Sequence, residues 1–212
     1  MTRALTSLLA LLLAAACASS QPASTNPTAA TVAVQPGDLP STMHRCSISG
    51  DITTYLDSLK VKDPATYTST QNEWTDAQSK GATATYVGFY TDSDANCTNV
   101  ASTVANLSAA AYPLVVNFSI QFKDEASAAD SYTNGQIFGI DRKTLKANDV
   151  PVVEGTKTGL GPNSIVLNTT ILSQSFYIAV WQNKAFMVIL GIINLDAVTG
   201  QKVADAENAR IK

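Results

Sequence analysis

The stretch from Gly159 to Leu195 constrains the fold more than any other, because it is the longest part of the chain that is dense in large apolar residues. These residues form three short runs, at 165–172, 176–181 and 186–193, with polar breaks between them. The runs are rich in β-branched and aromatic residues on both faces of an extended strand. Strands of this kind lie in the middle of a sheet whose two faces are both covered. The sequence therefore predicts three buried strands.

The break at Gln182-Asn183-Lys184, between the second and third runs, is typical of a hairpin. Periodicity alone leaves a buried helix open for 186–193. The length of the run, its β-branched residues and the central Gly191 favour a strand. The apolar side chains could line a ligand cavity or an interface, but burial in a core is the default for such residues.

The first 16 residues have the pattern of a secretory signal peptide, with Arg3 ahead of the apolar segment 8–16. Cys17 follows three alanines, which resembles the box of bacterial lipoprotein signals, where cleavage precedes a cysteine that receives a lipid. Ala14 stands where that box prefers leucine. The alternative is an ordinary secreted protein in which Cys17 is incidental.

Residues 17–38 contain almost no large apolar side chains and are rich in Ser, Thr, Ala and Pro. This composition predicts a flexible tether with a span of roughly 25 Å. The folded domain is expected to cover residues 39–212.

Cys46 and Cys97 are the two remaining cysteines, and in an exported domain they are expected to form a disulfide. Closing the loop of about 50 residues between these two cysteines would stabilise the fold by roughly 4 kcal/mol in the chain-entropy model. The alternatives are free thiols or a metal site, to which the single histidine, His44, gives little support.

Elsewhere the apolar spacing predicts helices over 50–60, 64–80, 124–134 and 196–212, and strands over 82–91 and 114–122. In the last of these strands Asn117, Ser119 and Gln121 alternate with apolar residues, which predicts one wetter face and an antiparallel sheet. The expected fold is a single α+β domain with a twisted antiparallel sheet of five to seven strands, flanked by helices.

The sequence contains no complete catalytic, cofactor or metal motif. Asp92, Asp94 and Asn96 match the start of a calcium loop, but Cys97 and Thr103 stand where such a loop needs glycine and glutamate. Gly159-Leu160-Gly161 leads into a strand, which predicts a turn and not a nucleotide loop. The single histidine, His44, is not accompanied by a G-x-S-x-G or S-x-x-K motif, so we expect no histidine-based hydrolase. Because the cofactor and metal motifs are also incomplete, we expect no cofactor and no metal.

Three segments resemble mycobacterial LpqN-type lipoproteins and the extracellular sensor domains of PknH-like kinases: FSIQFKDEASAADSYTN (118–134), TGLGPNSIVL (158–167) and FYIAVWQNKAFMVILG (176–191). The resemblance implies an antiparallel sheet flanked by helices, close to the Mog1p/PsbP type, and a binding or sensing role. It assigns no site residues.

These features together predict a non-enzymatic binding or sensing domain, held to a bacterial membrane outside the cytoplasm. Its partner would be an apolar small molecule or an envelope protein, at a surface formed by Tyr177, Trp181, Phe186 and Met187. One alternative is an interaction or assembly factor with an exposed aromatic patch around Trp181. Another is a hydrolase that uses carboxylates. A net charge of −3 without a basic stripe argues against nucleic acid.

Overall fold

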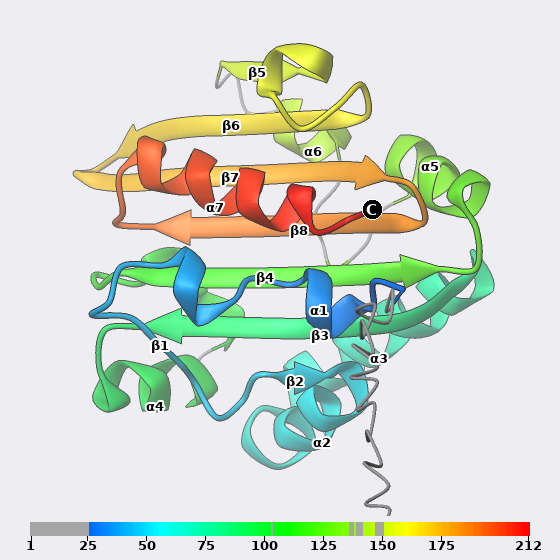
Figure 1. Cartoon of the computed structure of the whole chain (residues 1–212). Helices are drawn as coiled ribbons and strands as arrows, with labels where there is room; N and C mark the ends of the chain where they lie inside the picture. Colours follow the sequence, from blue (N-terminus) through cyan, green and yellow to red (C-terminus); the bar gives the residue numbers. More distant parts are fainter. Residues whose placement is uncertain (1–25, 103, 136–137, 139–141, 147–150) are drawn as a thin grey trace, which may run out of the picture.

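The computed structural model describes residues 26–102, 104–135, 138, 142–146 and 151–212. Within them, eight strands form one open antiparallel sheet in the order β1-β3-β4-β8-β7-β6-β5, and β2 also pairs with β3 (Figure 1). The strands are β1 His44–Arg45, β2 Gly50–Asp51, β3 Ala82–Thr91, β4 Leu114–Phe122, β5 Val152–Glu154, β6 Ser164–Ile171, β7 Gln174–Asn183 and β8 Phe186–Ile193. The α+β fold class is confirmed. The sheet has one strand more than the predicted maximum of seven, and two of its eight strands, β1 and β2, are only two residues long.

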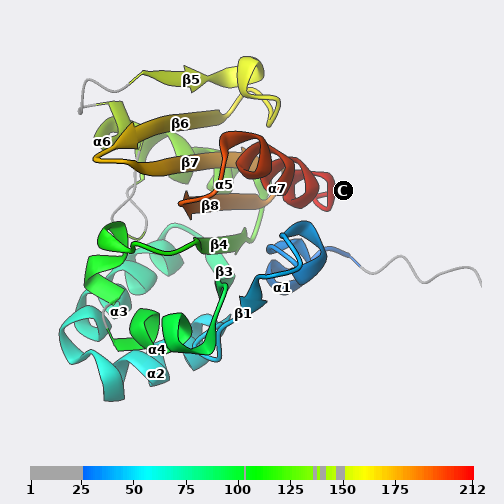
Figure 2. The ribbon, with the colours of Figure 1, turned by 90° about the vertical axis from the view of Figure 1, so that its left-hand side faces the viewer.

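The α-helices lie on both sides of this sheet (Figure 2). They are α1 Ala29–Val32, α2 Ile52–Lys62, α3 Pro64–Ser79, α4 Asp94–Ser102, α5 Glu125–Asn134, α6 Arg142–Lys146 and α7 Ala197–Ala209. Short 3-10 helices are η1 Pro36–Asp38, η2 Val104–Ala109 and η3 Gly155–Thr158. Helices α1 and α7 cover one face, which we call the α7 face, and α2 and α3 lie over the other, the α3 face.

The three apolar runs form the consecutive antiparallel strands β6, β7 and β8, as predicted. The third run is a strand and not a helix, and it lies at the centre of the sheet between β4 and β7. Because side chains alternate along a strand, each run contributes to two cores. Val188 and Leu190 belong to the core of the α7 face, and Met187 and Ile189 to that of the α3 face.

Residues 29–38, which we call the strap, pack over β3 and β4 on the α7 face. Val32 and Val34 are buried there, and the Arg210 guanidinium holds the strap by a bidentate pair with Asp38, at 2.8 and 3.0 Å. The structure thus places these residues in the fold and not in the predicted tether 17–38, so a domain start at residue 39 is too late. The tether residues 17–25 lie outside the described residues.

The strap and α7 also explain why the wetter face predicted for β4 is wrong. Asn117 and Ser119 are fully buried, because these two elements cover the face that they occupy. The Asn117 side-chain oxygen accepts a hydrogen bond from the Val34 backbone N–H at 3.1 Å, and its Nδ2 donates to both carboxyl oxygens of Glu207 at 3.0 Å. A polar network therefore replaces solvent at this position.

Glu207 on α7 is fully buried beside the strap. Burial raises its pKa well above the ordinary value of 4.5; Asn117 and Arg210 oppose this effect and Asp38 adds to it. The unfolded chain releases the proton near the ordinary pKa, whereas the folded chain keeps it to higher pH. The free energy of unfolding is therefore expected to fall as the pH rises from about 4.5 toward the folded-state pKa.

Glu207→Gln should remove this pH dependence and still offer an amide oxygen to Asn117. We expect the variant to be more stable than the parent near neutral pH by on the order of 1 kcal/mol, the scale for an incompletely compensated buried polar group. The difference in the free energy of unfolding between the variant and the parent should become smaller at pH values below the ordinary glutamate pKa. Urea unfolding at several pH values measures it, with the exposed Asp57→Asn as the control. A variant that is less stable at every pH would contradict the argument.

Gly200 lies in the first turns of α7, where a glycine weakens a helix. The structure supplies the reason for it, since a Cβ at this position would lie only 2.5 Å from the ring of Tyr177 on β7. The Tyr177 hydroxyl also donates a hydrogen bond to Gln201 at 3.1 Å, which holds the ring in place. Gly200 therefore allows α7 to approach the sheet closely.

Gly200→Ala should destabilise the protein although alanine is the better helix former. The helix propensity gain is about 1 kcal/mol, whereas overpacking against a rigid ring costs about 1–3 kcal/mol. A net loss in the free energy of unfolding is expected from urea titration. Gly37→Ala is the matched control, because its Cβ would meet no heavy atom within 4 Å. A Gly200→Ala protein more stable than the parent would refute the packing argument.

Candidate functional site

A pocket of about 350 Å³ opens on the α3 face, between the sheet and helices α2 and α3. Its floor is formed by half-buried apolar residues from β4, β7 and β8, and its walls come from the helices, η2 and Phe138. The floor residues are Val116, Phe118, Phe176, Ile178 and Gly191. The pocket is therefore lined mainly by carbon.

Gly191 explains why the floor is hollow. The strand register aligns it with Val116 on β4 and with Ile178 on β7. Because glycine has no side chain, the space between these two apolar side chains is left open. A Cβ there would meet nothing nearer than the Val116 carbonyl oxygen at 4.0 Å. Glycine within a strand often marks a place where another group approaches the backbone closely. Here it leaves space over the centre of the sheet.

Aromatic rings line one side of the pocket. The rings of Phe118 and Phe138 stack with centroids 4.5 Å apart and an interplanar angle of 22°. Tyr55 on α2 packs edge-on to Phe118 at 6.4 Å and lies 5.6 Å from Phe89. Such contacts give the wall a defined shape as well as an apolar surface.

Helix α3 supplies the polar side of the pocket through one stripe of residues. Thr66, Ser69, Thr70 and Glu73 follow the spacing that places side chains on a single helix face. The Thr66 hydroxyl donates to Asp63 at 2.7 Å and the Ser69 hydroxyl to the Thr66 carbonyl at 3.0 Å, so both are engaged within the helix. Burial raises the pKa of Glu73, and burial together with the charges of Asp63 and Glu73 raises that of Tyr55.

The four predicted surface residues lie elsewhere, and all are buried. Tyr177, Trp181 and Phe186 belong to the core under α7 and the strap, and Met187 belongs to the core of the α3 face. None of them lines the pocket, so the predicted surface is wrong at these positions. The exposed patch expected around Trp181 is absent for the same reason, since that side chain is fully buried beneath helical cover.

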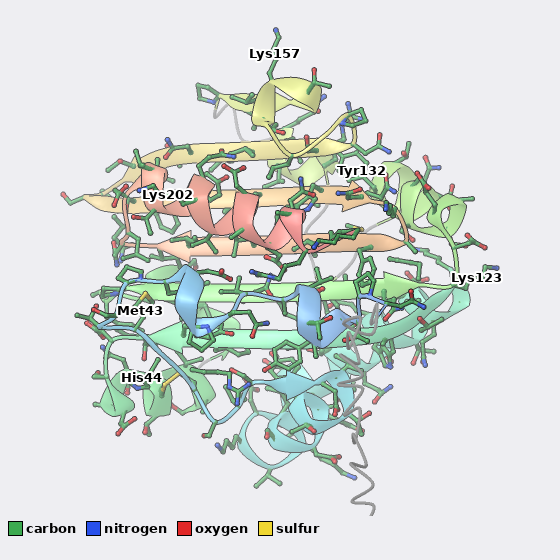
Figure 3. The ribbon with its side chains drawn as sticks, in the orientation of Figure 1. Met43, His44, Lys123, Tyr132, Lys157 and Lys202 are labelled. Atoms are coloured by element: carbon green, nitrogen blue, oxygen red, sulfur yellow. A yellow bond between two sulfur atoms is a disulfide. The ribbon has the colours of Figure 1, made fainter. Side chains whose placement is uncertain are left out.

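Cys46 and Cys97 form the predicted disulfide, which joins the segment between β1 and β2 to α4. His44 is on the surface near this bond (Figure 3), with its Nε2 3.1 Å from Asp94. Asp94 begins α4. Gly159 and Gly161, with φ of 81° and 115°, form the predicted turn ahead of β6.

A larger and more polar hollow, of about 570 Å³, lies beside the disulfide. Its lining includes Arg45 and Asp94, and both already have partners: Arg45 donates to the Tyr86 hydroxyl at 2.8 Å, and Asp94 pairs with His44. The α3-face pocket is the stronger candidate for a ligand site, because its apolar floor residues remain half-buried, whereas Arg45 and Asp94 in the larger hollow already have partners within the protein.

The described residues contain no group of three or more histidine, cysteine, aspartate or glutamate side chains placed to hold a metal. The same part of the chain contains no helix that is both long and apolar enough to cross a bilayer.

The fold and the site define an α+β domain with an apolar pocket on one face of its sheet. No family model matches this chain, and no curated protein matches it. Among solved structures, the crystal structure of the extracellular domain of PknH from Mycobacterium tuberculosis is similar over 85% of this chain and 93% of that chain, with 12% identity and a TM-score of 0.49. This weak likeness supports no conclusion about function, and nothing in these comparisons supports the resemblance to LpqN-type lipoproteins.

Proposed function

We propose that this protein is a non-enzymatic binding or sensing domain of the bacterial cell envelope, and that it takes up a small apolar molecule in the α3-face pocket. The observation that carries the proposal is the hollow over Gly191. Protein interiors rarely leave voids larger than a water molecule. A pocket of about 350 Å³ with an apolar lining falls within the range of small-molecule sites, about 300–1,000 Å³.

The accessibility of the floor supports uptake of a ligand. Phe118, Phe176 and Ile178 remain half-buried, whereas the corresponding side chains of the α7 face, such as Trp181 and Leu190, are fully buried. A ligand would therefore cover apolar surface that the fold itself leaves open, and this burial would stabilise the complex by roughly 25 cal/mol per Å².

Gly191→Leu tests this function by filling the floor. The neutral fluorescent probe N-phenyl-1-naphthylamine should bind the purified parent protein saturably, with an emission increase, and its affinity for the variant should fall by at least about tenfold, or 1.4 kcal/mol. The variant should keep its stability, because the added side chain enters open space.

Gly37→Leu is the control, since it adds the same side chain at an exposed position of the strap. Equal probe affinity in the parent and in Gly191→Leu would reject the pocket as the binding site.

We further infer that residues 1–16 direct export and that a lipid on Cys17 holds the protein to a membrane. These residues lie outside the described part of the chain, so the support is the sequence pattern. The Cys46–Cys97 disulfide adds independent support, because such bonds persist in oxidising compartments outside the cytoplasm.

Cys17→Ser should release the protein from the membrane of the producing bacterium. The parent should appear in the membrane fraction, and its mature mass should include a diacylglycerol. The variant should lack that mass and appear in the soluble extracytoplasmic fraction or culture medium, because one or more acyl chains provide the membrane affinity. Ser19→Ala is the control and should fractionate as the parent does. A parent protein without lipid mass would contradict the inference.

A further inference from the structure

The α3-face pocket carries one carboxyl group without a cation. Glu73 is half-buried on α3 and lies in the lining, whose described residues include no lysine, arginine or histidine. The nearby Lys80 ammonium is engaged with Asp76 at 2.6 Å. Within the described part of the chain, Glu73 has neither a hydrogen-bond partner nor an ion-pair partner.

The environment of Glu73 disfavours an isolated charge. Burial is the cause that raises its pKa, and no neighbouring cation lowers it. A cation brought next to this carboxylate would compensate for the lost hydration, whereas an anion would add repulsion between like charges. The electrostatics therefore distinguish between ligands that share the same apolar body.

Tyr55 supplies a second polar atom to the lining of the same pocket. Its ring contacts Phe89 and Phe118, which places it in the aromatic wall. Burial, with the charges of Asp63 and Glu73, raises the Tyr55 pKa. The phenol is therefore neutral, and its oxygen can accept a hydrogen bond. In the described residues this hydroxyl has no hydrogen-bond partner.

We propose that the pocket selects amphipathic amines, with the apolar body over Gly191 and the protonated amine at the Glu73 carboxylate and the Tyr55 hydroxyl. The inference rests on the proposed function, because it names the ligand class of the same pocket. An ammonium group has three donors and would use both acceptors. An alcohol would leave the carboxylate uncompensated, and a fatty acid would place a second anion beside it.

Calorimetric titration of the purified protein with decylamine, decan-1-ol and decanoate, each below its micelle concentration, tests the selectivity. Decylamine should bind at least about tenfold more tightly than decan-1-ol, which is 1.4 kcal/mol, and decanoate should bind most weakly. Glu73→Gln should remove the advantage of the amine over the alcohol, because a neutral amide neither attracts an ammonium group nor carries a charge that an alcohol leaves uncompensated. Asp57→Asn removes one exposed carboxylate outside the pocket and should preserve the parent order, which controls for net charge.

The outcomes separate this inference from the proposed function. Equal binding of the three compounds, abolished by Gly191→Leu, would overturn amine selection and leave the pocket intact as an apolar site. An amine preference that survives Glu73→Gln would also overturn it. Failure of all three compounds to bind, or binding that Gly191→Leu does not affect, would overturn the proposed function itself. Competition by lysophosphatidylethanolamine would support an amine-bearing lipid as the natural source, and lack of competition would support a free amine.

Discussion

The fold depends on covering two apolar faces of one sheet at the same time. Strands β7 and β8 are apolar on both faces, and a shift of one residue in their register would exchange the two sets of side chains. The two covers differ in how closely they approach. Helix α7 packs so near that Gly200 meets the Tyr177 ring, whereas α2 and α3 leave a hollow over Gly191. The pocket exists where the cover is incomplete.

Local chemistry made much of the fold predictable. The apolar runs became β6, β7 and β8, and the side chains of Asp51, Asp63, Asp124 and Asp196 cap the helices that begin after them. The prediction of the site residues failed for a different reason. Alternation assigns each residue to a face, but it does not tell which face is left partly uncovered, because distant helices decide this. The one local signal was Gly191, a glycine inside an apolar strand.

The strap shows a second limit of composition. Residues 29–38 resemble a tether because they have few large apolar side chains. A prediction of disorder from composition depends on the number of such side chains and takes no account of backbone hydrogen bonds to distant residues. Their order comes from partners far along the chain, since Asn117 accepts from the Val34 N–H and Arg210 donates to the Val32 and Ala33 carbonyls. A short segment with two valines can thus be held in place when a buried network completes its backbone hydrogen bonds.

The pairing of Arg210 with Asp38 joins the beginning of the described fold to its end. The two residues are 172 positions apart in sequence, yet their side chains are paired and hold the two segments together. A protease that trimmed either segment would admit water to the Asn117–Glu207 network and loosen the opposite terminus as well. The first and last segments of the described fold are therefore expected to unfold together, because each covers hydrogen-bonding groups of the other.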